Sequence, residues 1–145
     1  MFGNCKGTGK MDEIHLLILC LKFISPKYRC FSDVESMCAF IRRSVNYDGG
    51  IGQGPGLESH GGSTFCAVAA LALVGRLWDG TVLGGAQLER LKGWLLLKQG
   101  QGFHGRTNKP DDSCYAFWIG ATLTVSGNGN YGRAFQLSTT NNLPG

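Results

Sequence analysis

The chain has 145 residues, of which 43% are hydrophobic and 17% are charged, and its net charge is +4. This composition is typical of one folded domain with its own core and excludes a disordered chain. The small positive charge is far below the basic surface expected of a nucleic-acid-binding domain, so we expect no nucleic-acid partner.

The first 31 residues contain an apolar run at 14–24, which is too short to span a bilayer and is interrupted by His15 and Lys22. Acidic residues directly before the run also argue against a signal peptide. Four of the six cysteines lie in apolar, helix-like runs, where a free thiol behaves as a small hydrophobic group. We therefore predict a cytoplasmic protein that is not a membrane protein.

Four helices are predicted in the middle of the chain, each opened by a small or polar capping residue or a turn. The caps are Ser32 or Asp33 for the first helix, Ser63 or Thr64 for the second and Asp112 or Ser113 for the last. Gly75 ends the second helix, as C-terminal glycines do. The predicted spans are 33–44, 65–75, 86–100 and 114–123.

Residues 47–75 and 98–123 follow one plan. Each segment begins with a Gly-rich turn that holds a bulky apolar residue, Ile51 or Phe103, and then enters an apolar helix through a polar loop. An amphipathic helix precedes each segment, so that one repeat has about 50 residues and two helices. This period predicts stacked helical hairpins, as in a solenoid or a closed α/α barrel.

Asp112 and Cys114 lie at the predicted start of the last helix. The first residue of a helix is not yet helical, so the carboxylate and the thiol can converge there, and a thiol at a helix N-terminus has a lowered pKa. Together with a distant histidine, the two would form a zinc site with one open position. The alternative is an aspartate N-cap followed by a buried cysteine, and the spacing alone does not decide between them.

Arg106 and Lys109 lie in a loop just before the same helix. Two cations in front of a helix N-terminus can bind phosphate oxygens, and His60 of the equivalent loop and Tyr115 could join them. The alternative is a solvated loop with surface charges. His104 could be a ligand or a base, but a lone histidine in a turn is more often simply solvated. Aromatic side chains nearby are either core or the wall of an apolar lipid tunnel: Phe65, Phe103, Tyr115, Phe117 and Trp118.

The segments "YDGGIGQGPGLESHGGSTFC" and "GFHGRTNKPDDSCYAFWIGATL" resemble the β subunits of the protein prenyltransferases. The resemblance runs from about residue 34 to 123 and is greatest to the type I geranylgeranyltransferases. It implies an all-α fold, an α/α toroid of helical hairpins, here incomplete. We expect the repeats over 32–125, an unmatched segment at 1–31 and a disordered tail at 126–145.

The resemblance also implies roles for single residues. Asp112 and Cys114 match two of the family's three zinc ligands, and Cys66 and Trp118 match positions in the isoprenoid channel. Residues that match those gripping the isoprenoid diphosphate are His60, Arg106, Lys109 and Tyr115.

The implied reaction transfers a geranylgeranyl group from its diphosphate to the cysteine of a C-terminal CaaX motif, with zinc holding that cysteine as a thiolate. The cationic side chains would stabilise the leaving diphosphate. Expected partners are a prenyltransferase α subunit and CaaX-ending small GTPases. For magnesium the resemblance implies nothing, because the deciding position in the family falls beyond residue 145.

The family's third zinc ligand is a histidine one repeat further on, and the sequence ends 31 residues after Cys114. Neither His60 nor His104 matches it. We therefore expect this chain alone to bind zinc weakly and to be inactive, as a truncated isoform or an incomplete gene model would be. Alternatives are a non-catalytic helical-repeat module, a farnesyl- or Rab-type β subunit and, less favoured, a terpene-cyclase-like toroid.

Overall fold

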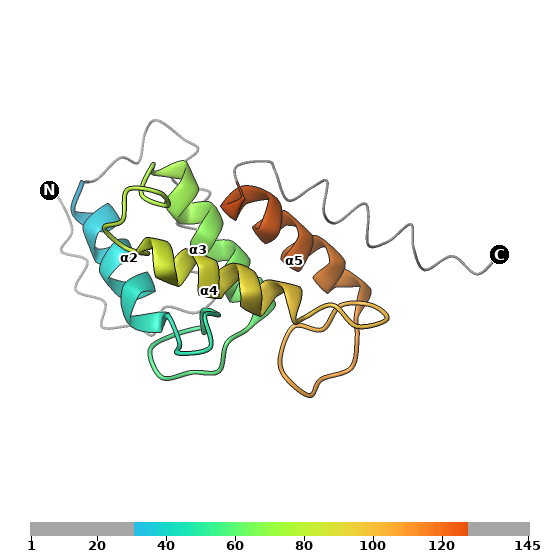
Figure 1. Ribbon diagram of the computed structural model, residues 1–145. Coiled ribbons are helices and arrows are strands. Elements are labelled where there is room, and N and C mark those ends of the chain that lie inside the picture. Colours follow the sequence, from blue (N-terminus) through green and yellow to red (C-terminus); the bar gives the residue numbers. More distant parts are fainter. Residues whose placement is uncertain (1–30, 128–145) are drawn as a thin grey trace, which may run out of the picture.

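The computed structural model describes residues 31–127, and side chains from residue 34 onward. This part of the chain folds into four helices joined by loops and three isolated β-bridges, which confirms the predicted all-α class (Figure 1). Most of the predicted end segments, 1–31 and 126–145, lies outside the described residues. The helices are α2 (Phe31–Ser44), α3 (Gly61–Leu73), α4 (Gly85–Leu96) and α5 (Ser113–Ser126).

Helix α3 begins at Gly61, four residues before its predicted start, and the predicted cap is wrong. His60 is the N-cap, because its Nδ1 accepts the backbone N–H groups of Gly62 and Ser63 at 3.1 and 3.4 Å. The hydroxyl groups of Ser63 and Thr64 bind the preceding turn instead. Ser63 Oγ donates to the carbonyl of Ile51 at 2.8 Å, and Thr64 Oγ1 accepts the N–H of Ile51 at 3.0 Å.

Gly75 ends α3 as predicted. Its φ of +73° is in the left-handed region that glycine enters without strain. The N–H of Arg76 donates to the carbonyl of Leu71 at 2.8 Å, and that of Gly75 donates to Ala72 at 3.1 Å. These two bonds form a Schellman motif, which satisfies carbonyl groups that the end of the helix would leave unpaired.

The core lies between the helices, which contribute side chains three or four residues apart. Helix α5 lies beside α3 and also contacts α4 (Figure 1). Buried positions of α5 are Ile119, Thr122, Leu123 and Ser126, spaced so that they share one face. The other helices add, among others, Met37, Ile41, Ala67, Val68, Leu71, Leu91 and Leu95.

The two Gly-rich turns have the same construction, as the repeat predicts. Ile51 forms a β-bridge with Val45, just after α2, and Phe103 forms one with Gln99, shortly after α4. Ile51 is fully buried and Phe103 is half-buried. Each turn thus returns the chain to the end of the preceding helix and places an apolar side chain against the core.

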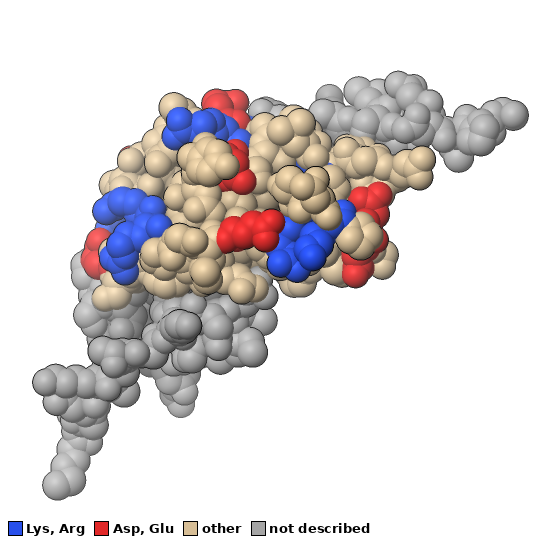
Figure 2. All heavy atoms as spheres, turned by 90° about the horizontal axis from the view of Figure 1, so that it is seen from below, with Lys and Arg blue, Asp and Glu red and all other residues tan. Residues whose placement is uncertain are grey.

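Acidic and basic side chains are interspersed on the face shown in Figure 2, and they form no single basic surface there. No helix within residues 31–127 is long and apolar enough to cross a membrane.

Candidate functional site

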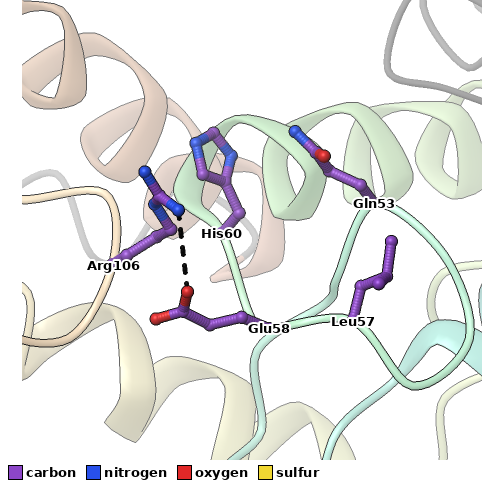
Figure 3. A pocket seen from close by; sticks show the side chains of 5 residues that line it. All are labelled: Gln53, Leu57, Glu58, His60 and Arg106. Atoms are coloured by element: carbon purple, nitrogen blue, oxygen red, sulfur yellow. Dashed lines mark ion pairs between the residues drawn. The ribbon is translucent and has the colours of Figure 1, made fainter.

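A cavity of about 280 Å³ lies where the two repeats meet (Figure 3). The loop before α3 lines it with Gln53, Leu57, Glu58 and His60, and the loop before α5 adds Arg106. A histidine and an arginine from segments 46 residues apart therefore face one space. The structure brings together these two of the four residues predicted to bind an anion.

Tyr115, the third of them, contacts the cavity through His60. The Tyr115 hydroxyl oxygen lies 3.0 Å from His60 Nε2, and the two rings meet edge to face. Because His60 Nδ1 accepts backbone N–H groups, it carries no proton, and the proton of the neutral ring is on Nε2. The Nε2–H group thus donates to the Tyr115 hydroxyl.

Arg106 provides the positive charge of the cavity. Its Nη1 lies 3.7 Å from Glu58 Oε2, so that the carboxylate and the guanidinium form an ion pair at the cavity (Figure 3). Lys109 is exposed and is not among the lining residues. Between them the chain turns sharply at Asn108, which has a φ of +58°, and the N–H of Lys109 donates to the carbonyl of Arg106 at 3.4 Å.

Close backbone contact brings the two loops together at glycines. The N–H of Gly61 donates to the carbonyl of Gly105 at 2.8 Å. A Cβ on Gly105 would lie 2.1 Å from the ring of Tyr115, and one on Gly61 would lie 3.1 Å from the Tyr115 and Ile119 side chains. Any larger residue at Gly105 would displace Tyr115, so glycine is required for this arrangement.

Asp112 and Cys114 adjoin this region at the start of α5. Asp112 is the N-cap, as predicted, and its Oδ1 accepts the N–H of Cys114 at 3.0 Å. This bond is the main cause that lowers the pKa of the Asp112 carboxyl group, and a hydrogen bond from the Cys114 thiol is the next. Both side chains are exposed, so the alternative of a buried cysteine behind the cap is excluded.

The predicted lowering of the Cys114 pKa is wrong. Partial desolvation, followed by the hydrogen bond and the negative charge of Asp112, raises the pKa of the thiol above its ordinary value. A carboxylate beside the thiol stabilises the protonated form more than the helix N-terminus stabilises the thiolate. A metal ion would reverse this balance, because it takes the place of the proton.

An exposed carboxylate and an exposed thiol two residues apart are suitable as two ligands of a zinc ion. Between residues 31 and 127, however, no three His, Cys, Asp or Glu side chains are grouped so as to hold a metal. His104 lies elsewhere in the loop, where its Nδ1 is 3.4 Å from Asp111 Oδ1. The other oxygen of Asp111 accepts the N–H of Gly102 at 2.8 Å, so this pair braces the turn.

The aromatic side chains of α3 and α5 form a cluster at the surface. Phe65, Phe117 and Trp118 have ring centroids 5.0–5.5 Å apart. Phe117 is 60% exposed, which excludes the core as its place and leaves the other alternative, the wall of an apolar tunnel. Cys66, one of the two predicted channel residues, is 6% exposed and belongs to the core, whereas Trp118 is half-buried.

Lys98 was not among the predicted site residues, because a lysine at the end of an amphipathic helix is expected to be exposed to solvent. The structure buries it beneath the loop that carries Arg106, with its Nζ 3.1 Å from Thr107 Oγ1. The position of Lys98 four residues after the apolar Trp94 is the only signal for this in the sequence.

The sequence matches the family model of the prenyltransferase alpha-alpha toroid domain over residues 10–145. The chain belongs to this family. Its fold is therefore the α/α toroid, in which helical hairpins such as α2–α3 and α4–α5 follow one another around a ring.

Two relatives within the prenyltransferase family bear the same name, geranylgeranyl transferase type-1 subunit beta. The protein of Dictyostelium discoideum is 45% identical over 119 residues, which cover 81% of this chain and 32% of the relative. That of Arabidopsis thaliana is 45% identical over 102 residues, 66% of this chain and 27% of the relative. The protein farnesyltransferase subunit beta of Pisum sativum is 39% identical over 94 residues, 63% of this chain and 21% of the relative.

A solved structure agrees with these relatives. The Candida albicans protein geranylgeranyltransferase-I complexed with GGPP superimposes with a TM-score of 0.67 and 26% sequence identity, and the match covers 91% of this chain and 41% of that one. The chain thus spans less than half the length of each prenyltransferase it matches here.

Proposed function

We propose that this chain is part of the β subunit of a protein geranylgeranyltransferase of type I. That enzyme transfers a geranylgeranyl group from geranylgeranyl diphosphate to the cysteine of a C-terminal CaaX motif. The observation that carries the proposal is the pairing of an anion site made by both repeats with the Asp112–Cys114 pair beside it. The names of the two relatives with 45% identity favour the geranylgeranyl over the farnesyl group.

The anion site suits a diphosphate. Arg106 can form two parallel hydrogen bonds with phosphate oxygens, and the exposed Lys109 can close over them from the same turn. His60 and Tyr115 form a hydrogen-bonded pair at the other side of the cavity. Arg106 and Lys109 would stabilise the negative charge that develops on the leaving diphosphate when its bond to the lipid breaks, and the Tyr115 hydroxyl, which accepts from His60, would keep its own proton to donate.

Asp112 and Cys114 would hold a zinc ion, which when bound would keep the acceptor cysteine as a thiolate. The cap bond fixes one oxygen of Asp112 on the backbone N–H of Cys114 and so holds the two ligands together. Losing the thiol proton of Cys114 is favoured once a cation lies next to it. We infer no role for magnesium.

The aromatic cluster would take the lipid. Phe65, Phe117 and Trp118 offer a partly exposed apolar surface on the two helices that follow the loops lining the cavity. Since α3 and α5 lie side by side, a chain leaving the diphosphate can run along this surface. We assign Trp118 to this channel and place Cys66 beneath its wall, in the core.

The partners that follow are a prenyltransferase α subunit and CaaX-ending small GTPases, and the activity belongs to the cytoplasm. The relatives' names, which describe beta subunits, support the α partner. The cysteines Cys38, Cys66 and Cys114 are free, as a reducing compartment allows.

Lipid binding tests the anion site directly. We expect the 145-residue chain to bind geranylgeranyl diphosphate in isothermal titration calorimetry and geranylgeraniol much more weakly, because the alcohol lacks the diphosphate. Arg106→Gln should lower the affinity for geranylgeranyl diphosphate at least tenfold and leave the affinity for geranylgeraniol unchanged. Equal affinities for the two lipids would contradict the proposal.

Zinc is tested by the alkylation of Cys114 with iodoacetamide, followed by mass spectrometry of each cysteine. Zinc should slow the reaction of Cys114 and leave that of the buried Cys38 unchanged. Asp112→Asn keeps a good helix cap but removes the charged ligand, so it should abolish the protection. Protection that survives in this variant would rule out the paired site.

Transfer is tested with the whole β subunit assembled with an α subunit, using labelled geranylgeranyl diphosphate and a peptide ending in Cys-a-a-Leu. We expect label on the peptide cysteine, and its loss in Cys114→Ala. An assembly that binds lipid and zinc but transfers nothing would favour the non-catalytic helical-repeat module instead.

A further inference from the structure

Lys98 is a buried cation at the junction of α4 with the loop before α5. Its side chain is only 5% exposed, which is uncommon for lysine. Removing an ammonium group from water is unfavourable unless polar groups or aromatic faces replace the lost hydration. The contacts of Lys98 are therefore the reason that it can be buried.

Three contacts surround Lys98, and two of them hold the loop. Its Nζ donates to Thr107 Oγ1 at 3.1 Å, and its carbonyl accepts the N–H of His104 at 3.1 Å. The Nζ also lies 4.7 Å from the ring centroid of Trp94, within the range of a cation–π interaction. One residue thus joins the chain just after α4 to two points of the loop.

Arg106 lies between these two points. The segment around it is open to solvent, since Thr107, Asn108 and Lys109 are all exposed. The carbonyl of Gly105 is held by the N–H of Gly61, so the loop is fixed on the α3 side as well. With both neighbours of Arg106 fixed, the direction in which its side chain leaves the loop is fixed too.

We propose that Lys98, through Thr107, is a positioning residue that aims Arg106 into the cavity for a phosphate-bearing ligand. The inference rests on the proposed function, because it takes the cavity to be an anion site. Burial lowers the pKa of Lys98, while the negative charges of Asp48 and Glu58 oppose this shift. They thus favour the charged ammonium group, which donates to Thr107 Oγ1.

Two variants of the exposed Thr107 test the contact without disturbing the core. Thr107→Val removes the acceptor, and Thr107→Ser keeps it. With inorganic pyrophosphate as the probe in isothermal titration calorimetry, we expect the valine variant to bind about three- to tenfold more weakly, and the serine variant within about twofold of the wild type. Thermal unfolding of both variants shows whether either loses its fold.

A double-mutant cycle separates positioning from a purely structural role. If Lys98 and Thr107 act through Arg106, Thr107→Val should have no further effect on pyrophosphate binding in an Arg106→Gln background. Lys98→Met should behave like Thr107→Val in both backgrounds, and Lys98→Arg, which keeps a charged donor, should recover part of the affinity.

The outcomes distinguish the inference from the function on which it rests. A wild-type chain that binds no pyrophosphate overturns both the anion site and the positioning role. Binding that is equal in wild type and Thr107→Val overturns the positioning role alone. The same loss from Thr107→Val with and without Arg106 also overturns it, because the effect would then not pass through the arginine.

Discussion

His60 uses its two ring nitrogens for two different interactions, and substitutions can separate them. Nδ1 caps α3 through the N–H groups of Gly62 and Ser63, and Nε2 bonds the hydroxyl of Tyr115 on α5. Asparagine at position 60 keeps a side-chain oxygen for the cap but is too short to reach Tyr115. Alanine removes both interactions.

The magnitudes follow from the two interactions. A helix N-cap contributes about 1 kcal/mol. A hydrogen bond between neutral groups adds about 1 kcal/mol. We therefore expect His60→Ala to lower the free energy of unfolding by about 2 kcal/mol and His60→Asn by about 1 kcal/mol. Urea denaturation followed by circular dichroism measures both values.

Tyr115→Phe completes the test, because it removes the hydroxyl group and leaves the ring. It should cost about 1 kcal/mol in the wild type and less in His60→Asn, where the bond to His60 is already absent. Equal losses for His60→Ala and His60→Asn would refute the assignment of the cap to the imidazole. An undiminished effect of Tyr115→Phe in His60→Asn would refute the bond between the two residues.

Three further predictions concern buried groups around the site. Thr64→Val should lower the free energy of unfolding by about 2 kcal/mol, because it leaves the N–H of Ile51 unpaired. Thr64→Ser should lower it by about 1 kcal/mol for the lost methyl group. Equal values in urea denaturation would contradict this. Gly105→Ala should displace Tyr115, destabilise the chain by about 1–3 kcal/mol and weaken pyrophosphate binding; wild-type affinity would contradict the close contact. Burial lowers the pKa of Lys98 in the folded chain below the 10.5 of a free lysine, so just below that pH the unfolded chain binds more protons than the folded one. Stability should therefore rise with pH in this range. Lys98→Met should lack this rise when melting temperatures are compared from about pH 8 upward.

The sequence contained enough local information to predict four helices, the cap at Asp112 and the glycine end of α3. These features depend on residues close in the chain, such as an aspartate before an apolar run or a glycine after one. The equivalence of Ile51 and Phe103 was also predictable, because both turns repeat the same pattern of glycines around an apolar residue.

The start of α3 could not be predicted from local preferences. Two glycines at 61 and 62 read as a turn, and histidine is not a usual cap, whereas Ser63 and Thr64 are. The helix starts earlier because Gly61 must approach Gly105 and Tyr115, 44 and 54 residues away. The burial of Lys98 depends on the folded loop, through its contact with Thr107. The raised pKa of Cys114 depends on partial desolvation first and then on the neighbouring Asp112.

The proposed anion site draws its groups from two hairpins, and this has a consequence for folding. His60 and Tyr115 meet only when α5 is docked on α3, so undocking α5 would dismantle the site. Docking and ligand binding are then one coupled equilibrium. A ligand at a hundred times its Kd would favour the docked arrangement by about 2.7 kcal/mol. Hydrogen exchange in α5 should therefore slow when a ligand fills the cavity.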